Sequence, residues 1–525
     1  MTRPLHRTIV PRAVGRAVLA VARQRVRSWD RALQRIDAVQ TRELLSICQH
    51  AKETEFGRAR GFASIRSYGD FRQQVPIGDY DAFSPQIERM RRGETNVLIP
   101  EFVRYFGNSS GSSTQGRSKF LPISERQIRQ QTGSAADALF RHLAHQGDDA
   151  FFQGFTLGLF PPTTMRREGP VLVTSNPALM AVKKPRVTQL AYLPRDRACL
   201  ETADYAKKLE LIAERYLDHD VRAVAGTTCW FSLLFDNLLA TARRRGRSAR
   251  TVTEIWPNLR VLLGGGVSAG PYHDVLRERL GRDDVVLVDT YNATEGGVYA
   301  TTDHSGSPGL LMIPDRGVFF EFIPVEDHEA ALPRRVPLWE VEQDRVYAIV
   351  VTTPSGLYAY KLGDLVRFPS LRPLRVEFVG RTSGCLSTTQ ELTTFSEIES
   401  GVAAALEACP AIAVDFAAGA DVGVDGSARS RYVLFVEFAA GRAPADLAGF
   451  AGAFDDGLRA ANRVYREHRT NEVAILAPEL VALPPGSVRR FLGEVRRGNV
   501  QAKFPRVVDE EQKRILRGYA SEGTN

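Results

Sequence analysis

A loop rich in glycine and hydroxyl side chains is the first feature of this sequence that could do chemistry. It runs from Asn108 to Lys119 as Asn-Ser-Ser-Gly-Ser-Ser-Thr-Gln-Gly-Arg-Ser-Lys. Glycines let consecutive backbone N–H groups point into one concave surface, hydroxyls add donors, and such a surface binds phosphate. Lys119 adds a fixed positive charge. The loop therefore predicts a site for the phosphates of ATP. The pattern does not indicate which hydroxyls contact the phosphates, and the candidates are Ser109, Ser110, Ser112, Ser113 and Thr114.

Two other interpretations of the loop are open at this point. Gly111 to Ser118 nearly fits the Walker A pattern, but Arg117 stands where that pattern has lysine. The residues that follow, 120–123, include Pro122 and predict extended chain, whereas a helix must follow a Walker A loop. A flexible linker is the second alternative, and the motifs below weaken it.

Further candidate groups come after predicted buried strands. Gly265 and Gly266 belong to a triple glycine that is either a simple turn or a place where adenine could approach bare backbone. Tyr291 could stack on adenine or belong to the core. Glu295 lies in a segment where open α/β sheets bind ligands, and its carboxylate suits Mg²⁺ that bridges phosphates. A solvated loop glutamate is the alternative.

Asp364 comes directly after Gly363 at the end of another predicted strand. Its two carboxylate oxygens could accept hydrogen bonds from both ribose hydroxyls, although a capping or surface aspartate would look the same. Lysine is rare here, because only nine of the 69 lysines and arginines are lysine. A lysine inside a sequence motif is therefore informative. Three lysines lie in the hydroxyl loop or in the motifs described below: Lys119, Lys361 and Lys503.

The predicted elements indicate a large α/β body with a β-rich layer. The chain has 525 residues, too many for one hydrophobic core, so at least two domains are expected. Apolar spacing predicts helices over 14–50, 125–147 and 200–245. Buried strands are predicted at 259–263 and 285–288. The strands of the β-rich layer are predicted at 317–325, 345–353, 357–368 and 374–379.

A smaller α+β unit follows residue 380. Strands are predicted at 413–416 and 432–438, and a helix places one apolar face at Leu447, Phe450, Phe454, Leu458 and Ala461. The stretch 417–430 is rich in glycine, alanine and aspartate, and it is expected to be a flexible connection.

Composition excludes several classes of protein. Five scattered cysteines without a CxxC pair indicate neither a zinc site nor a disulfide framework, which favours a reducing cytoplasm. The net charge of +8 comes with a strong arginine bias, so it is weak evidence for nucleic acid, and no nucleic-acid partner is predicted. The apolar stretch at 18–22 is too short to span a membrane, and it predicts a basic amphipathic helix, with membrane-surface contact as the lesser alternative.

Taken together, these motifs resemble those of the auxin-responsive acyl acid–amido synthetases, a family of the acyl-adenylating superfamily that includes luciferases. The resemblance extends from about residue 30 to about residue 508 and depends on the order of several motifs along one chain. These are Thr54–Arg58, Val75–Ile77, Ile87–Glu94, Ser109–Pro122, Tyr291–Gly296, Gly356–Asp364 and Gln501–Arg506.

The resemblance implies a fold and a set of roles. It implies a large N-terminal domain, 1–380, that binds ATP and acyl acid, a hinge at 381–390, and a mobile C-terminal lid domain, 391–525. In this comparison Lys503 is the catalytic cation on the lid, because a positive charge eases the attack of a carboxylate on the α-phosphate. Lys119 is the second catalytic lysine. The further roles it implies are nucleotide contacts by Thr294 and Arg381, and an acyl-pocket wall formed by Trp230 and Phe231, which could equally be core residues.

Three departures from the family pattern are visible. The hydroxyl loop is one residue longer, Ala359 and Lys361 stand where the family usually has arginines, and Glu391 stands where relatives often have lysine. The expected activity is ATP- and Mg²⁺-dependent adenylation of a carboxylic acid, followed by transfer of the acyl group to an amine, such as an amino acid. The alternatives are an acyl-CoA ligase with the same first step and a catalytically weak nucleotide-binding homologue. Neither the acid, the amine nor the oligomeric state follows from the sequence.

Overall fold

The computed structural model describes most of the chain. The described residues are 5–109, 119–184, 186–265, 273–328, 330–382, 393–422, 429–462, 475–495 and 503–522, with the short pieces 386, 424, 465–466 and 469–472. The chain divides into two compact units. The first holds residues 1–269, 276–362 and 366–377, and the second holds 270–275, 363–365 and 378–525. The domain boundaries at 380 and 390 stay a prediction, since most of 381–390 lies outside the described residues.

A parallel sheet of five strands forms one part of the first unit. Its order is β6 (Tyr192–Leu193), β3 (Phe155–Gly158), β7 (Val221–Ala225), β8 (Val261–Leu263) and β9 (Val286–Val288). The predicted buried strands at 259–263 and 285–288 are confirmed as β8 and β9. The helix predicted over 200–245 is wrong in its middle, because the short run Val221–Ala225 pairs with β3 and β8 as a strand.

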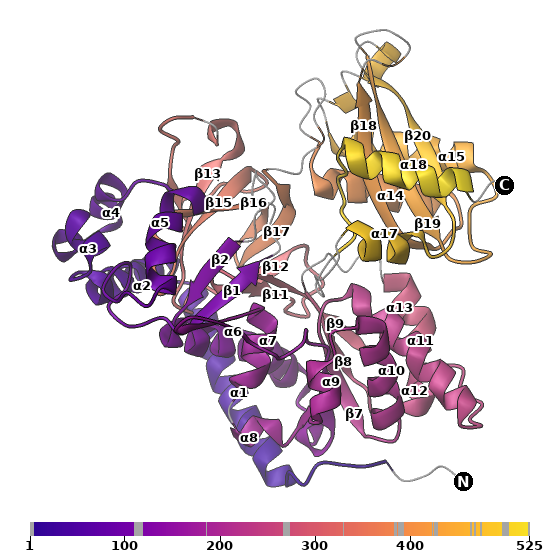
Figure 1. Cartoon of the computed structure of the whole chain (residues 1–525), viewed down its shortest axis with the longest axis horizontal. Helices are drawn as coiled ribbons and strands as arrows, with labels where there is room; N and C mark the ends of the chain where they lie inside the picture. Colours follow the sequence, from indigo (N-terminus) through magenta and orange to yellow (C-terminus); the bar gives the residue numbers. More distant parts are fainter. Residues whose placement is uncertain are drawn as a thin grey trace. The chain divides into compact units, whose positions relative to one another are not determined.

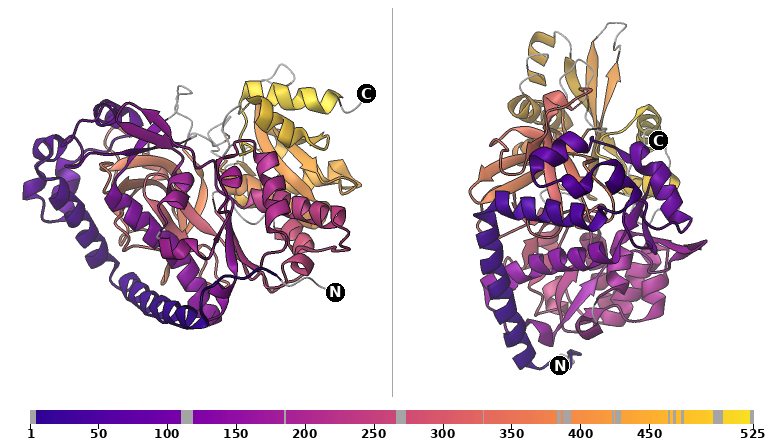
Figure 2. Two further views of the ribbon diagram at one scale, coloured as in Figure 1. Left: turned by 60° about the horizontal axis from the view of Figure 1, so that its bottom comes forward. Right: turned by 90° about the vertical axis from the view of Figure 1, so that its left-hand side faces the viewer.

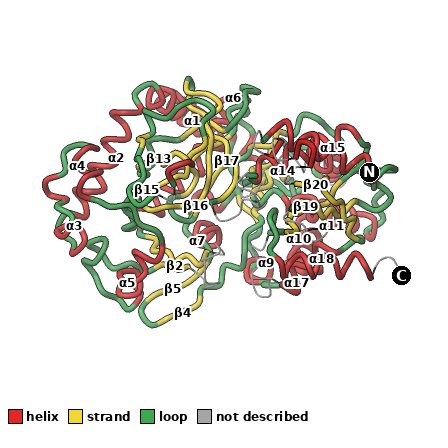
Figure 3. Tube along the Cα trace, turned by 90° about the horizontal axis from the view of Figure 1, so that it is seen from above, coloured by secondary structure: helices red, strands yellow, loops and turns green. Residues whose placement is uncertain are grey.

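Two mixed or antiparallel sheets complete the β structure of this part of the chain. The smaller has the order β2 (Lys119–Ile123), β1 (Tyr105–Ser109), β5 (Val171–Thr174) and β4 (Arg166–Glu168). The larger is the predicted β-rich layer, in which β13, β15, β16 and β17 lie side by side (Figure 3). Its order is β10 (Thr290–Ala293), β11 (Gly297–Thr301), β12 (Leu310–Met312), β17 (Leu374–Arg381), β16 (Tyr360–Leu371), β15 (Val346–Thr352), β13 (Phe319–Pro324) and β14 (Val336–Pro337).

Helices cover these sheets (Figure 1). They are α1 (Arg12–Leu33), α2 (Ile36–Ala51), α3 (Glu55–Ala59), α4 (Tyr68–Gln74), α5 (Tyr80–Arg91), α6 (Glu125–Gln146), α7 (Asn176–Val182), α8 (Arg186–Gln189), α9 (Arg197–Glu201), α10 (Tyr205–Tyr216), α11 (Cys229–Arg244), α12 (Val252–Ile255) and α13 (His273–Leu280).

The long helix α1 is the basic amphipathic helix that the sequence predicts, and Figure 2 shows its length. Its apolar face is covered by the protein: Leu19 packs with Leu139 and Leu143 of α6, and the indole of the fully buried Trp29 donates a hydrogen bond of 2.7 Å to the carbonyl of Met312. The apolar side of this helix therefore contributes to the core. Among the described residues, no helix has the length and apolar character needed to cross a membrane.

A buried charge network fastens α1 to α6. Asp137 on α6 is fully buried, and its two carboxylate oxygens accept from Arg25 at 2.9 and 2.8 Å and from Arg316 at 2.6 and 2.7 Å. Arg25 also donates to Asp315 at 2.6 and 2.7 Å. Burial alone would lower the pKa of Arg25, but the hydrogen bonds to the two aspartates raise it, so the guanidinium stays charged.

The second unit is a three-stranded sheet with helices on both faces (Figure 1). Strand β18 (Ala413–Val422) pairs antiparallel with β19 (Ser430–Phe438), which pairs parallel with β20 (Ile475–Leu483). Alternate residues of β19 enter two different cores. One core holds α14 (Phe395–Ala408) and α15 (Leu447–Ala461), and the other holds α17 (Ser487–Val495) and α18 (Glu510–Glu522).

Two expectations for this unit need correction. Residues 417–422 are not a flexible connection, because they continue β18. Small residues are required there: a Cβ on Gly419 would lie 2.7 Å from the Cδ of Lys513 on α18. The apolar face of α15 is also shorter than predicted, since Phe450, Phe454 and Leu458 are buried, whereas Leu447 and Ala461 at the two ends are exposed.

Candidate active site

The ends of the hydroxyl loop are held by two paired strands. Ser109, the last residue of β1, lies opposite Lys119, the first residue of β2. Lys119 is partly buried, and its ammonium lies 5.7 Å from the centroid of the Tyr80 ring. The Walker A interpretation is wrong, because an antiparallel strand follows the loop where a helix is needed. The predicted ligands Ser110, Ser112, Ser113 and Thr114 lie outside the described residues.

The turn that carries Thr294 and Glu295 lies against β1. A Cβ added to Gly107 would lie only 2.9 Å from Cγ2 of Thr294, so the glycine lets the turn approach the strand that leads into the loop. The carbonyl of Thr294 accepts from the amides of Gln127 and Gln131, at 3.1 and 3.2 Å. The partly buried Glu295 therefore follows a residue that is fixed by two helical side chains.

Gly265 lies beside β10, and Gly266 is outside the described residues. The hydroxyl of Thr290 donates to the carbonyl of Gly264 at 2.8 Å. A Cβ on Gly265 would lie 2.4 Å from the Thr290 hydroxyl oxygen and 2.7 Å from the Asn292 amide nitrogen. Thr290 and Asn292 of β10 therefore pack directly on this stretch of backbone, and it has no room for a side chain at Gly265. Tyr291 is buried, with its ring edge-on to Tyr299 at 5.5 Å between centroids.

The segment after β7 joins the same edge of the sheet. The backbone amide of Leu159 donates to the carbonyl of Ala225 at 2.7 Å, and the backbone amide of Gly226 donates to the carbonyl of Leu263 at 3.0 Å. Thr228 is fully buried, and its hydroxyl has no hydrogen-bond partner among the described residues. A Cβ on Gly264 would lie 2.5 Å from that hydroxyl. The carboxyl ends of β3, β7 and β8 thus form one continuous edge, where parallel sheets bind ligands.

The two predicted acyl-pocket residues differ in exposure. Phe231 is fully buried and packs as a core residue, whereas Trp230 is partly exposed at the start of α11. Of the two, Trp230 is the one whose surface a substrate could reach.

Asp364 and Arg381 form an ion pair within the second unit. The distance between Arg381 Nε and Asp364 Oδ1 is 3.0 Å, and the Asp364 side chain is 5% exposed, against 51% for Arg381. The pair places one buried carboxylate and one solvent-facing guanidinium at the same point.

Lys503 is an exposed residue on an anchored segment of the second unit. Phe504 is buried in the core against α17 and α18. Arg506 forms an ion pair with Asp415 and lies over the ring of Phe416 at 4.3 Å. Phe504 and Arg506 therefore anchor the segment, and Lys503 lies at its surface.

Sequence reasoning missed the residues that position the turn. Gln127 and Gln131 lie four residues apart on α6, so they share one helix face, and that spacing is the signal that could have found them. Gly107, inside β1, was missed as well. Glycine within a strand often marks a close approach of other backbone, and here it admits Thr294.

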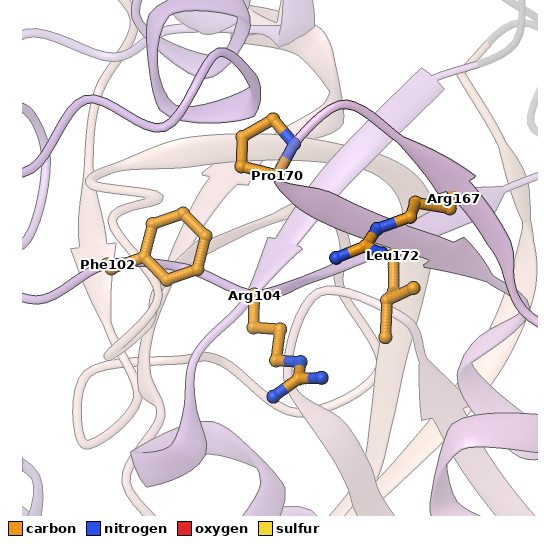
Figure 4. A pocket seen from close by; sticks show the side chains of 5 residues that line it. All are labelled: Phe102, Arg104, Arg167, Pro170 and Leu172. Atoms are coloured by element: carbon orange, nitrogen blue, oxygen red, sulfur yellow. The ribbon is translucent and has the colours of Figure 1, made fainter.

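A separate hollow of about 400 Å³ lies on the four-stranded sheet (Figure 4). It is lined by Phe102, Arg104, Arg167, Pro170 and Leu172. None of the predicted site residues is among them, so this hollow is not the site that the motifs indicate.

Models of one family match three ranges of the chain. The GH3 family N-terminal domain matches residues 25–159, the central domain matches 311–381, and the C-terminal domain matches 396–512, which together cover more than half of the chain. The chain belongs to the GH3 family. The predicted resemblance is confirmed, and with it the predicted class: GH3 proteins are ligases that join an acid to an amino acid through an adenylate.

Individual GH3 proteins are distant relatives of this chain. The putative indole-3-acetic acid-amido synthetase GH3.10 of Oryza sativa subsp. japonica is 25% identical, over 74% of this chain and 88% of the relative. The jasmonoyl--L-amino acid synthetase GH3.5 of Oryza sativa subsp. japonica is 29% identical over 50% of this chain and 48% of its own length.

Solved structures agree with the adenylate-forming fold. The AtGH3.15 acyl acid amido synthetase in complex with 2,4-DB matches with a TM-score of 0.77 and 19% identity, over 97% of both chains. A 2-hydroxyisobutyryl-CoA ligase in the postadenylation state, in complex with 2-HIB-AMP, matches with a TM-score of 0.58 and 16% identity, over 93% and 92%. The predicted fold, an α/β body with a β-rich layer and a smaller α+β unit, is confirmed.

Proposed function

We propose that this GH3 protein uses ATP to convert a carboxylic acid into its acyl adenylate and then transfers the acyl group to the amine of an amino acid. In the first step a carboxylate oxygen attacks the α-phosphorus, and pyrophosphate leaves. In the second step the amine attacks the acyl carbonyl carbon, and AMP leaves. The approach of Gly107 to Thr294, which brings the turn with Glu295 against the strand that leads into the loop, is the observation that carries the proposal.

The first unit supplies the groups for the nucleotide. Ser109, Lys119 and the loop between them are assigned to the phosphates, because donors and a positive charge gather there. Gly265 and Gly266 are assigned to adenine together with Tyr291, and Thr294 to the phosphate side of the turn. The close packing of Gly265 on β10, the strand that carries Tyr291, supports this assignment.

Glu295 is assigned to Mg²⁺. Mg²⁺ in nucleotide sites is held by one or two carboxylates together with phosphate oxygens and water, so a single partly buried glutamate beside the loop strand fits the ion. Among the described residues no cluster of three metal-binding side chains occurs. When bound, the ion would neutralise phosphate charge.

The second unit supplies the remaining groups. The carboxylate of Asp364 is assigned to the ribose hydroxyls, and Arg381 to ribose or phosphate. Lys503 is assigned to the transition state of adenylation, where its ammonium offsets the charge that gathers as a carboxylate meets the α-phosphate. The exposed position of Lys503, on a segment anchored by Phe504 and Arg506, supports a role toward a bound molecule. We assign residues 391–525 to a mobile lid, with its hinge at 381–390.

The acyl acid is assigned to the segment after β7, with Trp230 on its wall and Phe231 behind it. Two relatives named above are, by their names, a putative indole-3-acetic acid-amido synthetase and a jasmonoyl--L-amino acid synthetase, and the acid used by this chain is to be found by screening. We further propose that the protein acts in the cytoplasm, because its cysteines are free where described: Cys48, Cys199 and Cys409.

The test is a pyrophosphate-exchange assay over a library of acids, followed by mass spectrometry for amides after all amino acids are added. Exchange that depends on an acid, with amide as the product, is the expected result. The Glu295→Gln variant should lose exchange, whereas the matched change of an exposed surface carboxylate, Glu522→Gln, should not. Thioester in place of amide when CoA is added would favour the ligase alternative. Binding of ATP without exchange would identify a catalytically weak homologue.

A further inference from the structure

One lysine of the first unit has an ammonium between aromatic rings. Lys184 follows α7, and its Nζ lies 3.5 Å from the centroid of the Tyr192 ring and 4.3 Å from that of Phe160. The side chain is partly buried, and burial lowers the pKa of Lys184 to about 7. No carboxylate among the residues that the structure describes forms an ion pair with it.

The neighbouring lysine shows the usual arrangement. The Nζ of Lys183 lies 2.8 Å from the carboxylate of Glu125, and this hydrogen bond holds the pKa of Lys183 above its usual value although burial opposes it. Two adjacent lysines at the end of one helix are therefore treated differently by the fold. The ammonium of Lys183 has a counter-charge as well as a ring, that of Tyr105 at 4.5 Å, whereas Lys184 has rings and, in the described structure, no counter-charge.

A second buried lysine meets the same phenylalanine. The ammonium of Lys208 donates to the carbonyl of Phe160 at 2.8 Å, and burial lowers the pKa of Lys208 to about 8. Two of only nine lysines thus converge on Phe160, and no carboxylate in the described structure pairs with either. Removing a cation from water without a counter-charge costs free energy, and clusters of such groups are typical of binding sites.

Phe160 connects these lysines to the acyl side of the candidate site. A Cβ on Gly158 would lie 1.9 Å from the Phe160 ring, so the ring covers the end of β3. The next residue, Leu159, lies against Gly226, where an added Cβ would be 2.9 Å from it. In the sheet order β6-β3-β7-β8-β9, Lys184 thus lies on the β6 and β3 side of the acyl segment, and Gly265 lies on the β8 side.

The other end of α7 also carries polar atoms without partners. Thr174 Oγ1, Ser175 Oγ and Asn176 Oδ1 are buried, and none has a hydrogen-bond partner in the described structure. Thr174 pairs with Gly107 of β1, beside the strand that leads into the loop. Helix α7 therefore has unsatisfied polar groups at its start and an unpaired cation just after its end, which does not suit a purely apolar acyl group.

We propose that Lys184 binds a second anionic group of the acyl acid, so that the substrates are acids with a further negative charge remote from the carboxylate that reacts. The proposal rests on the proposed function, since it assigns the distal end of the same acyl site. It gives the proposed acyl pocket a cation at its far end.

The test compares matched acids in the full-length protein. Dicarboxylic acids of increasing length are set against their half-amides and against methyl-terminated acids of the same length, and pyrophosphate exchange is measured without any amine. Exchange needs no acceptor, so a preference seen there belongs to the acyl acid. We expect the dicarboxylic acid of the best length to exceed its half-amide in kcat/KM by about tenfold to a hundredfold. The Lys184→Met variant should bring that ratio to about one, and the control Lys183→Met should keep the ratio.

A second measurement does not depend on turnover. Reductive methylation followed by peptide mass spectrometry reports the reactivity of each lysine, and the dicarboxylic acid should protect Lys184 more than its half-amide does. Equal protection by both acids, or an unchanged ratio in Lys184→Met, would overturn the proposal. Exchange with acids that lack a second charge would leave the proposed function intact, whereas absence of exchange with every acid would count against that function while protection of Lys184 still decides this site.

Discussion

Two polar regions of the first unit differ in how completely their buried polar groups are hydrogen-bonded. Around Asp137, every charged group that joins α1 to α6 has a partner, with hydrogen bonds of 2.6 to 2.9 Å to Arg25 and Arg316. The carboxyl edge of the parallel sheet and the elements beside the Thr294 turn have buried polar atoms without partners among the described residues: Thr228 Oγ1 after β7, Gln127 Oε1 and Gln131 Oε1 on α6, and Thr174 Oγ1 on β5.

The difference indicates that one region contributes to stability and the other to ligand binding. Buried polar atoms are almost always paired in folded proteins, so a group of unpaired ones needs an explanation. We infer that the unpaired edge is kept for a ligand, and that changes in the two regions should fail in different ways.

The largest expected effect is on stability, in the network. Asp137→Ala leaves two arginines beside a cavity without their shared carboxylate, and removal of one partner from a buried ion pair costs about 3–5 kcal/mol. Chemical unfolding, followed for the first unit, measures the loss. The control is Asp283→Ala, because the exposed pair of Asp283 with Arg277 should contribute less than about 1 kcal/mol. A loss for Asp137→Ala as small as the control would remove the contrast between the two regions.

The next effect is on catalysis without a loss of stability. Lys503 is exposed, so Lys503→Ala should leave the melting temperature unchanged. The rate of adenylation should fall about a hundredfold to a thousandfold, as it does when a group that stabilises transition-state charge is removed. Pyrophosphate exchange and thermal melting are measured on the same preparation. Lys207→Ala, at an exposed position of α10, is the control, and a rate within about threefold of the control would refute the role of Lys503.

The sequence predicts one of these regions far better than the other. Glycines, hydroxyls and Lys119 mark the candidate site in the first unit, because ligand chemistry demands particular residue types. The buried strands β8 and β9 are visible as short apolar runs between turn signals. Asp137 and Arg25 give no such signal, since they are 112 residues apart and look like ordinary charges on helices.

Two predictions of secondary structure were wrong, for different reasons. The run 417–422 has the composition of a linker, yet Gly419 is small because Lys513 packs on it. Strand β7 was missed inside a helical pattern, because its pairing with β3 and β8 is a tertiary contact that local periodicity does not report.

The third prediction concerns pH and sharpens what an unpaired group means. His142 is buried, its Nδ1 has no partner in the described structure, and burial, together with repulsion from His304 and His145, lowers its pKa to about 4. The unfolded chain, with a pKa near 6.5, binds more protons between pH 4 and 6.5, so stability must fall as the pH falls through this window. His142→Asn should reduce that loss by roughly 1–2 kcal/mol.

Unfolding midpoints at a series of pH values measure this effect, with His273→Asn, at an exposed position, as the control. An identical pH dependence in His142→Asn and in the unmodified protein would mean that His142 is not the group responsible. A weaker pH dependence in His142→Asn would instead show that this unpaired group acts on stability, unlike the unpaired edge that we assign to a ligand.

The smallest expected effect is at Gly265, and it tests that edge directly. Alanine there would bring a methyl group within 2.4 Å of the Thr290 hydroxyl, which must then rotate and give up its hydrogen bond of 2.8 Å to Gly264. We expect the KM for ATP to rise about tenfold, with a loss of stability of about 1 kcal/mol, the usual value of one hydrogen bond. The control is Gly452→Ala within α15, where an added Cβ meets nothing within 4 Å and should be neutral or slightly stabilising. If Gly265→Ala lowered stability as much as Asp137→Ala without changing the KM for ATP, the edge would be a packed structural region like the network. A rise in KM with little unfolding would show that the arrangement of Thr290 on Gly265 matters for nucleotide binding, because the fold itself would then tolerate the added methyl group.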